Sequence, residues 1–268
     1  MTDAAPRLAR DLFGTLPDGR AVERVVLRGL GGFEAHVITY GATLLALIVP
    51  DANGRCEDIA LGHDGLSGYL AQRHFFGATV GRYANRIANA RFVLDGEEMR
   101  LAANNGPHAL HGGPDGFDRK LWDIADIENG TEPGVTLAYT SPHGEEGYPG
   151  RLNVRLTYRL TGPSELSRAF TARTDRPTIV NLSNHSFFNL ELLTDQPGLQ
   201  VYSGNYLDGS IAGKRGRLYR QSDAICLEPQ IWPNAPNRAD FPSPRLAPDG
   251  IYRHHTVYRF SRSQRGSN

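Results

Sequence analysis

Two titratable side chains, His185 and Glu228, have the neighbours that proton-transfer chemistry needs. His185 follows the strand-like run TIVNL and precedes two phenylalanines, and the Asn and Ser residues around it are expected to be its hydrogen-bond partners. Its ordinary pKa of about 6.5 suits a proton donor near neutral pH, although a lone histidine is more often structural. Glu228 stands in the apolar run ICLEPQI, where burial would raise its pKa and improve it as a base. Strand alternation equally allows Glu228 to face water, and the residues alone leave both alternatives open.

A polar stretch at residues 81–92, GRYANRIANARF, places two arginines and two asparagines within nine residues. Guanidinium and amide groups each carry several hydrogen-bonding atoms, which suits the recognition of hydroxyl groups. Spacing alone favours the simpler interpretation, a loop whose arginines face water.

A second polar stretch, NNGPHALHGG, places His108 and His111 at HxxH spacing. A metal site usually needs three protein ligands, and neither a cysteine nor a carboxylate stands at ligand spacing here. We therefore expect no metal at this motif. Gly112 and Gly113 predict instead a tight backbone that lets a ligand approach His111.

The elements that must position these side chains are strands. In NVRLTYRL and GVTLAYT, apolar residues alternate with polar ones at a period of two. AHVITYGATLLALIVPD is rich in β-branched and aliphatic residues, with Gly41 as its expected bend. Turn sequences such as PDGR, LDGE and NNGPH follow at short intervals, and only DGLSGYLAQ favours a short helix. The sequence predicts an all-β fold, a sandwich or a barrel, in one domain over residues 1–268.

Composition limits the partners. The 268 residues include 29 basic and 29 acidic side chains, so no net field attracts nucleic acid or an acidic membrane. No apolar run approaches the roughly 20 residues of a membrane span, and the opening MTDAAPRLARDLFG lacks the apolar region of a signal peptide. Cys56 and Cys226 are too few for a disulfide framework. We expect a cytoplasmic protein that acts on a neutral small molecule.

Several stretches, in the same order, resemble the aldose 1-epimerases, also called galactose mutarotases. The resemblance runs through YGATLLALIVPD, GRYANRI, LHGG, GEEGYPG and NHSFFNL, and resumes at QPGLQVYSGNYLDG, LEPQIWPNAPN and FPSPRLAP. It implies a large antiparallel β-sandwich of the galactose-mutarotase type. The implied reaction interconverts the α and β anomers of free aldoses such as glucose and galactose. The resemblance also implies no cofactor, no metal and a monosaccharide partner, and we expect a monomer or a weak dimer.

The resemblance further implies a role for each matching residue. The family's catalytic acid corresponds to His185 and its catalytic base to Glu228. Its sugar-binding residues correspond to Asn85, Arg86, His111 and Gln200. Phe187 adds an aromatic face, and it stands where the family usually has tyrosine, so one hydroxyl is absent. We expect Glu228 and His185 on one concave face, with their functional atoms a sugar ring apart.

One departure from the family is larger. After NHSFFNL the family has a long further stretch, with several strands and an Asp-His pair whose aspartate binds sugar hydroxyls. Here FFNL runs directly into ELLTDQPGLQVYSG, which predicts an internal deletion after Leu190 and the loss of several strands. We expect Leu190 to Thr194 to be irregular and nearby apolar residues to be unusually exposed.

Two other classes of protein compete with an active epimerase. The deletion favours a catalytically impaired carbohydrate-binding homologue or a truncated product. A metal-dependent sugar isomerase or hydrolase is the third class, and it rests on the histidines alone.

Overall fold

The structure, a computed structural model, describes residues 8–51, 53–188 and 191–260. Within these ranges regular structure is almost entirely antiparallel strand, with one α-helix of 6 residues, α1 (Leu66–Ala71). The predicted all-β fold is confirmed, and α1 forms inside the stretch where the sequence predicts a short helix. No helix in this part of the chain is long and apolar enough to cross a membrane.

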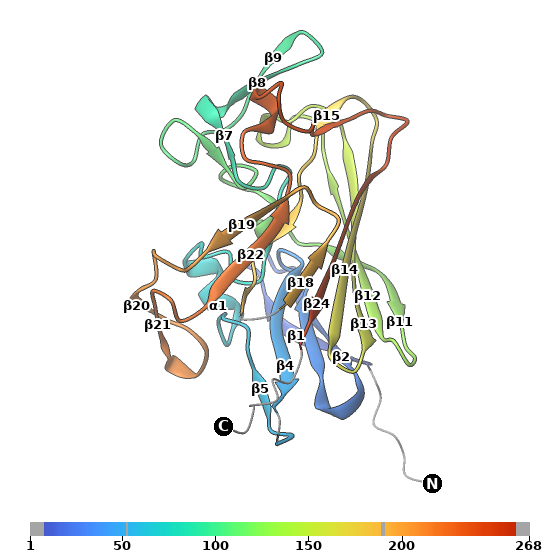
Figure 1. The fold of residues 1–268 in the computed structure, drawn as a ribbon, viewed down its shortest axis with the longest axis vertical. Helices are drawn as coiled ribbons and strands as arrows, with labels where there is room; N and C mark the ends of the chain where they lie inside the picture. Colours follow the sequence, from blue (N-terminus) through green and yellow to red (C-terminus); the bar gives the residue numbers. More distant parts are fainter. Residues whose placement is uncertain (1–7, 52, 189–190, 261–268) are drawn as a thin grey trace, which may run out of the picture.

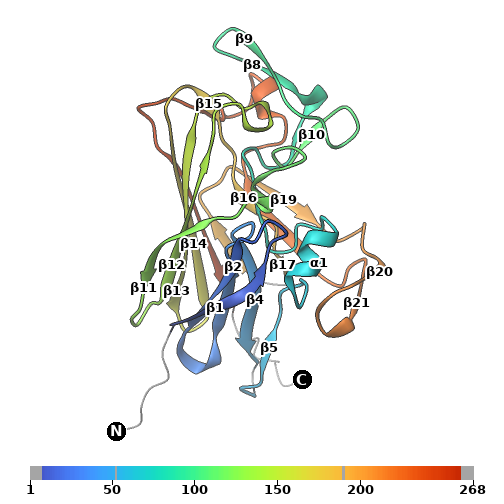
Figure 2. The ribbon, with the colours of Figure 1, turned by 180° about the vertical axis from the view of Figure 1, so that it is seen from behind.

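Two large antiparallel sheets face each other along the molecule (Figure 1). The first has the strand order β1 (Leu8–Thr15), β2 (Ala21–Arg28), β3 (Glu34–Ile38), β4 (Thr43–Pro50) and β5 (Cys56–Asp58). The second has the order β11 (Asp123–Glu128), β12 (Gly134–Ser141), β13 (Leu152–Gly162), β14 (Glu165–Thr174), β24 (Tyr252–Arg259) and β18 (Glu191–Thr194). Seen from behind, α1 lies beside the first sheet (Figure 2).

The two sheets bury one apolar core between them, as a sandwich does. Leu27 on β2 and Leu156 on β13 belong to the same buried cluster. The alternation predicted along β13 is confirmed, because Val154, Leu156, Tyr158 and Leu160 are buried while the residues between them are more exposed. Each such apolar side chain contributes roughly 1.5–3 kcal/mol by leaving water.

Gly41 forms the bend predicted between β3 and β4. Its φ is +66°, and a Cβ there would lie 2.5 Å from the carbonyl oxygen of Asp118. The positive φ and the close approach both require glycine.

A smaller sheet lies beside the sandwich, with the strand order β17 (Phe187–Phe188), β22 (Ile225–Gln230) and β19 (Gly198–Tyr202). In Figure 1, β19 and β22 cross the middle of the molecule. Five short antiparallel pairs complete the fold: β6 (Thr79–Val80) with β16 (Ser183–Asn184), β7 (Arg86–Ile87) with β10 (Ala109–Leu110), β8 (Arg91–Leu94) with β9 (Glu97–Arg100), β15 (Thr178–Ile179) with β23 (Arg245–Leu246), and β20 (Asp208–Ala212) with β21 (Leu218–Arg220). The small sheet matters most for function, because it carries Glu228 and Gln200.

The segment after Leu190 is regular, so the prediction of irregular backbone there is wrong for Glu191 to Thr194. These residues form β18, paired from Glu191–Arg259 to Thr194–Thr256. The edge of β24 offers unpaired backbone groups, and the short segment satisfies them by adding one more strand. Leu190 itself lies outside the described residues.

Apolar side chains on and after β18 are exposed, as the sequence predicts. Leu193 is 44% exposed, and Leu199 and Val201, two apart on β19, are 47% and 51% exposed. Because β19 is an edge strand, its outer face is both apolar and uncovered.

The core also contains a buried charge, the guanidinium of Arg168. Arg168 on β14 is 1% exposed, and Nε, Nη1 and Nη2 of its guanidinium have no hydrogen-bond partner among the described residues. The group lies over the ring of Tyr258, 5.3 Å from the centroid, and Tyr258 packs on Phe188 next to the predicted deletion. A buried charge of this kind destabilises the fold unless other interactions compensate.

Candidate active site

His185 lies between β16 and β17, where two backbone hydrogen bonds fix its position. Its N–H donates to the carbonyl of Ala78 (2.9 Å), and its carbonyl accepts from the N–H of Gly77 (3.0 Å). The neighbouring Asn and Ser side chains hold the backbone instead of the imidazole: Ser183 Oγ donates to the carbonyl of Pro229 and Asn184 Nδ2 to that of Gly77. The interpretation of these residues as partners of the imidazole is therefore wrong.

Glu228 faces inward from β22, which resolves the alternative that the sequence leaves open. It is 2% exposed, and its Oε1 lies 3.6 Å from Nε2 of His185. Its other oxygen, Oε2, has no hydrogen-bond partner among the described residues. The predicted convergence of the two groups on one site is what the structure shows.

The prediction that the functional atoms of His185 and Glu228 lie a sugar ring apart is wrong, because they are adjacent. The reacting oxygens of an aldose, the anomeric hydroxyl and the ring oxygen, are both bonded to the anomeric carbon. Two groups that serve both oxygens can therefore lie side by side, as His185 and Glu228 do.

Burial shifts both pKa values away from the ordinary range, in opposite directions. It lowers the pKa of His185 to about 4. It raises the pKa of Glu228 to about 8, an effect that the Cys226 thiol and the charge of Arg86 oppose. Between these values the pair holds one proton, which rests on Glu228.

His111 is held by the backbone of Asn85. The N–H of Asn85 donates to Nδ1 of His111 (3.2 Å), and the N–H of His111 donates to the carbonyl of Asn85 (3.0 Å). Burial, with the charges of neighbouring groups, lowers the pKa of His111 well below its ordinary value, so the ring is neutral. Because Nδ1 accepts, the ring proton sits on Nε2, and His111 is a hydrogen-bond donor.

Gln200 connects this group to the small sheet. On β19 it stands directly opposite Glu228 on β22, so the two side chains share one face. Its Oε1 accepts from Nδ2 of Asn85 (3.0 Å). Three segments distant in the sequence therefore converge beside the acid–base pair.

Arg86 lies at the rim. Its side chain is exposed and its Nε donates to Asn105 Oδ1 (2.9 Å), yet it lines the same cavity as His185. The two arginines of this motif have different environments. Unlike Arg86, Arg82 is buried, and it donates to the carbonyls of Pro149 and Gly150. The simple solvated-loop interpretation is therefore wrong for Arg82 and incomplete for Arg86.

Arg86→Ala is expected to lower kcat/KM by about tenfold to a hundredfold. A hydrogen bond from a charged group is worth roughly 1.5–3 kcal/mol, and each 1.4 kcal/mol is about tenfold. A positioning contact acts on bound substrate and transition state alike, so affinity and rate should fall together. Arg91→Ala, on the exposed face of β8, is the matched control. Equal kinetics for both variants would contradict a role in sugar binding.

All seven predicted site residues line one cavity of about 440 Å³. They are Asn85, Arg86, His111, His185, Phe187, Gln200 and Glu228. This volume lies within the roughly 300–1,000 Å³ of small-molecule sites. The shared cavity agrees with the roles that the resemblance implies, and those roles remain predictions.

The sequence interpretation missed several aromatic walls of this cavity. Phe75 packs against His111 and His185, with ring centroids 4.8 and 5.4 Å apart, and Tyr202 packs against Phe187 at 5.6 Å. Tyr202 follows Gln200 by two residues on β19, so strand alternation could have found it. No sequence signal marks Phe75. The other missed lining residues are Arg73, His74, Leu110, Asn205, Tyr206 and Leu207.

Three of the lining residues have a left-handed backbone: Phe75 (φ +58°), Asn85 (+63°) and His111 (+50°). Asparagine and histidine tolerate this region better than most residues, whereas phenylalanine rarely adopts it. Such conformations cost about 1–3 kcal/mol each and cluster at active sites. The surrounding fold therefore imposes the geometry of this cavity.

Gly112 and Gly113 form the tight backbone that the sequence predicts. A Cβ on Gly112 would lie 1.8 Å from the carbonyl oxygen of Gly81, and one on Gly113 would lie 2.2 Å from Glu146 Oε2. These close approaches are made by the protein itself, and the access of a ligand to His111 stays a prediction.

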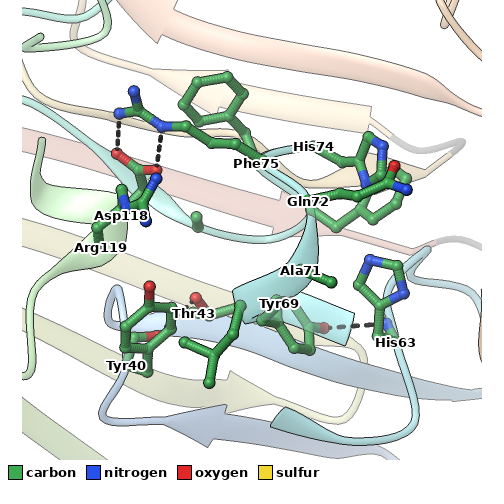
Figure 3. Close-up of a pocket in the computed structure, with 14 residues that line it drawn as sticks. Tyr40, Thr43, His63, Tyr69, Ala71, Gln72, His74, Phe75, Asp118 and Arg119 are labelled. Atoms are coloured by element: carbon green, nitrogen blue, oxygen red, sulfur yellow. Dashed lines mark hydrogen bonds and ion pairs between the residues drawn. The ribbon is translucent and has the colours of Figure 1, made fainter. Parts of the chain in front are cut away.

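A second cavity lies behind the wall formed by residues 73–75 (Figure 3). Asp118 and Arg119 lie on one side of it, and His63 and His74 on the other. At about 70 Å³ it is small beside known ligand sites, and it contains no acid–base pair. Arg73, His74 and Phe75 line both cavities, and the larger cavity is the candidate active site.

Three titratable groups of the larger cavity also have a metal-like arrangement. One ligand atom from each of His111, His185 and Glu228 lies within 4.8 Å of the others. A metal would need a lone pair on Nε2 of His111, but the N–H of Asn85 occupies Nδ1 and leaves the proton on Nε2. His108 lies outside the cavity and accepts at Nδ1 from the N–H of Asn89. The donor set therefore fits a hydrogen-bonding site better than a metal site.

Dialysis against EDTA is expected to leave turnover unchanged. The physical reason is the fixed donor tautomer of His111, which opposes metal coordination at Nε2. Turnover measured before and after dialysis checks it. Loss of turnover that added Zn²⁺ restores would contradict this expectation.

Comparisons with known proteins identify the family. A sequence model described as aldose 1-epimerase matches residues 23–194 and 190–259. The galactose mutarotase of Bos taurus is 35% identical over 343 residues, which cover 95% of this chain and 98% of the relative. The chain therefore belongs to the aldose 1-epimerase family.

Solved structures confirm the galactose-mutarotase type of fold. The GalM/aldose epimerase homologue from C. elegans has a TM-score of 0.82 at 25% identity, covering 88% of this chain and 98% of its own. The galactose 1-epimerase from Lactobacillus acidophilus NCFM has a TM-score of 0.84 at 20% identity, covering 96% and 99%. The second likeness concerns the fold alone.

The comparisons agree with a deletion after Leu190. The two matched parts of the family model meet at residues 190–194. The alignment with the bovine relative is 343 residues long and this chain has 268, so at least 75 aligned positions have no counterpart here.

Proposed function

We propose that this chain interconverts the α and β anomers of a free aldose, glucose or galactose, by acid–base ring opening and closure. The observation that carries the proposal is the buried His185–Glu228 pair, 3.6 Å apart in a cavity of polar and aromatic side chains. Membership of the aldose 1-epimerase family supports it. The relatives' names favour an enzyme over a merely carbohydrate-binding homologue.

The reaction needs one acid and one base on the same sugar. In ring opening the base removes the proton of the anomeric hydroxyl while the acid protonates the ring oxygen. The aldehyde then turns about the C1–C2 bond. In closure each group performs the reverse task, so each acts once as acid and once as base. The pair therefore needs one shared proton, whichever group holds it at rest.

The remaining side chains bind and orient the sugar. His111 offers a fixed N–H, and Asn85, Gln200 and Arg86 offer further polar atoms for hydroxyl groups. Phe75, Phe187 and Tyr202 offer ring faces for the C–H faces of a sugar. The bond between the anomeric carbon and the ring oxygen breaks and forms again within the sugar, and only protons pass between sugar and protein, so the chemistry requires no redox or group-carrying cofactor.

Polarimetry on freshly dissolved α-glucose and α-galactose tests the proposal. Wild-type protein should accelerate the approach to the equilibrium rotation well beyond the spontaneous rate. Binding of sugar without acceleration would instead support the carbohydrate-binding alternative.

The dependence of kcat/KM on pH is expected to be bell-shaped, with limbs near about pH 4 and about pH 8. Below the lower value His185 gains a second proton, so the pair lacks a base. Above the upper value Glu228 loses the last proton, so the pair lacks an acid. These apparent values belong to the coupled pair. Polarimetric rates, corrected for spontaneous mutarotation at each pH, measure the profile. A flat profile across both limbs would contradict the shared-proton mechanism.

A further inference from the structure

Cys226 contacts the acid–base pair from outside the cavity. Its Sγ lies 3.5 Å from Nδ1 of His185, while Oε1 of Glu228 lies 3.6 Å from Nε2 of the same ring. Cys226 and Glu228 are two apart on β22, so both face the ring, and both are buried. One strand therefore places a thiol at one nitrogen and a carboxyl at the other.

The protonation states of the Cys226 thiol and the His185 imidazole restrict which of the two can donate the hydrogen bond between Sγ and Nδ1. Burial raises the pKa of the Cys226 thiol well above its ordinary value, with the Glu228 charge adding to the effect, so the group remains S–H. A neutral imidazole has one N–H and one lone pair. Nδ1 therefore either donates its proton to the sulfur or accepts the thiol proton.

The shared-proton mechanism decides between these two tautomers. Nε2 is the nitrogen that faces Glu228, so Nε2 must give and take the moving proton. Nδ1 must then keep its own proton throughout, and it needs an acceptor. Among the described residues, the sulfur of Cys226 is the side-chain acceptor within hydrogen-bond distance of Nδ1.

We propose that Cys226 is a positioning residue whose sulfur accepts the Nδ1–H of His185 and holds the tautomer in which Nε2 exchanges protons with Glu228 and the sugar. The proposal rests on the proposed function for its kinetic consequence, and on the geometry alone for the tautomer. His111 and His185 then carry opposite tautomers for a physical reason: a backbone donor faces Nδ1 of the first, and a sulfur acceptor faces Nδ1 of the second.

Three substitutions at Cys226 separate hydrogen bonding from packing. The side chain does not line the cavity, so KM should stay constant while kcat changes. Cys226→Ser keeps a hydrogen-bond acceptor for Nδ1 and should retain most of kcat. Cys226→Val and Cys226→Ala remove the acceptor and should lower kcat by about tenfold to a hundredfold. A packing role predicts the opposite order, with valine best and serine worst, because a buried hydroxyl is costly. Cys56→Ala, at the exposed cysteine of β5, is the control and should match wild type.

The tautomer itself is measured without substrate. Long-range ¹H–¹⁵N spectra of histidine-labelled protein distinguish Nδ1–H from Nε2–H, and His185→Asn identifies the signal by removing it. The expected result is Nδ1–H in wild type and in Cys226→Ser, with a shift toward Nε2–H in Cys226→Ala. Nε2–H in sugar-free wild type, or full kcat in Cys226→Val, would overturn the proposal. If wild type fails to turn over sugar, the proposed function fails, while the spectra still decide the tautomer.

Discussion

Glu228→Gln is expected to lower kcat by about 10²–10⁴-fold, because glutamine keeps the shape of the side chain but cannot exchange a proton. Glu228 is buried against His185 and is one half of the only proton-exchanging pair that the mechanism uses. Sugar affinity should change little, since the polar contacts of Asn85, Gln200 and His111 remain. His185→Asn should have a similar effect from the other side of the pair.

The same substitution should preserve or increase stability. Burial raises the pKa of Glu228 from 4.5 to about 8, so the folded state keeps a proton that the unfolded state has lost. Wild-type stability from this group therefore falls as pH rises from about 4.5 to about 8. Glutamine does not titrate, so the Tm of the variant at the upper end of this range should equal or exceed that of wild type.

Polarimetry measures the loss of turnover, and calorimetric titration with sugar measures affinity. Thermal unfolding shows that the variant is folded, and Glu97→Gln, on an exposed strand, is the matched control. Wild-type turnover in both Glu228→Gln and His185→Asn would rule out the acid–base mechanism.

Insertion of a relative's segment after Leu190 is expected to raise kcat/KM by about tenfold to a hundredfold. The family resemblance implies an aspartate in that segment, and a charged hydrogen bond to a sugar hydroxyl is worth roughly 1.5–3 kcal/mol. At about 1.4 kcal/mol per tenfold this gives the stated range. Strands that support the cavity would add rigidity to the site.

The inserted strands should also raise Tm. They would cover the apolar outer face of β19, where Leu199 and Val201 are about half exposed. An inserted acceptor that reached the guanidinium of Arg168, which has no hydrogen-bond partner among the described residues, would compensate a buried charge.

Two controls separate these effects. A Gly/Ser linker of the same length controls for chain length, because such a linker adds no strands. A chimera whose inserted aspartate is replaced by asparagine should keep the gain in Tm and lose much of the gain in rate. If the chimera and the present chain have equal kcat/KM and equal Tm, the deletion is harmless and the prediction is wrong.

Local patterns predicted the strands well, because alternation reports directly on burial. Val154 to Leu160 on β13, the bend at Gly41 and the helix at Leu66–Ala71 follow from neighbours in the sequence. The exposed apolar residues after β18 follow from the predicted loss of their cover. The pairing of β18 with β24 could not be predicted from local patterns, because it depends on a free edge that exists only in the assembled sheet.

The site was predicted mainly through the family resemblance, and its physical reasons lie in long-range contacts. The register that sets Gln200 opposite Glu228 is a property of the β19–β22 ladder. The same strand places Cys226 against His185, and nothing in the sequence near Cys226 indicates this. Phe75 was not predicted as a site residue, because its position depends on a left-handed backbone conformation that a phenylalanine in the sequence does not indicate.

The position of β24 has a consequence for synthesis of the chain. It is the last strand in the described part of the chain, yet it lies between β14 and β18 in the second sheet. During translation both neighbours leave the ribosome before residues 252–259 exist, and each then presents an unpaired edge. Closure of this sheet must wait until residues 252–259 have been synthesised, which prolongs exposure to aggregation. A stop codon shortly before Tyr252 would remove both ladders at once, so residues 252–259 decide whether the second sheet can close.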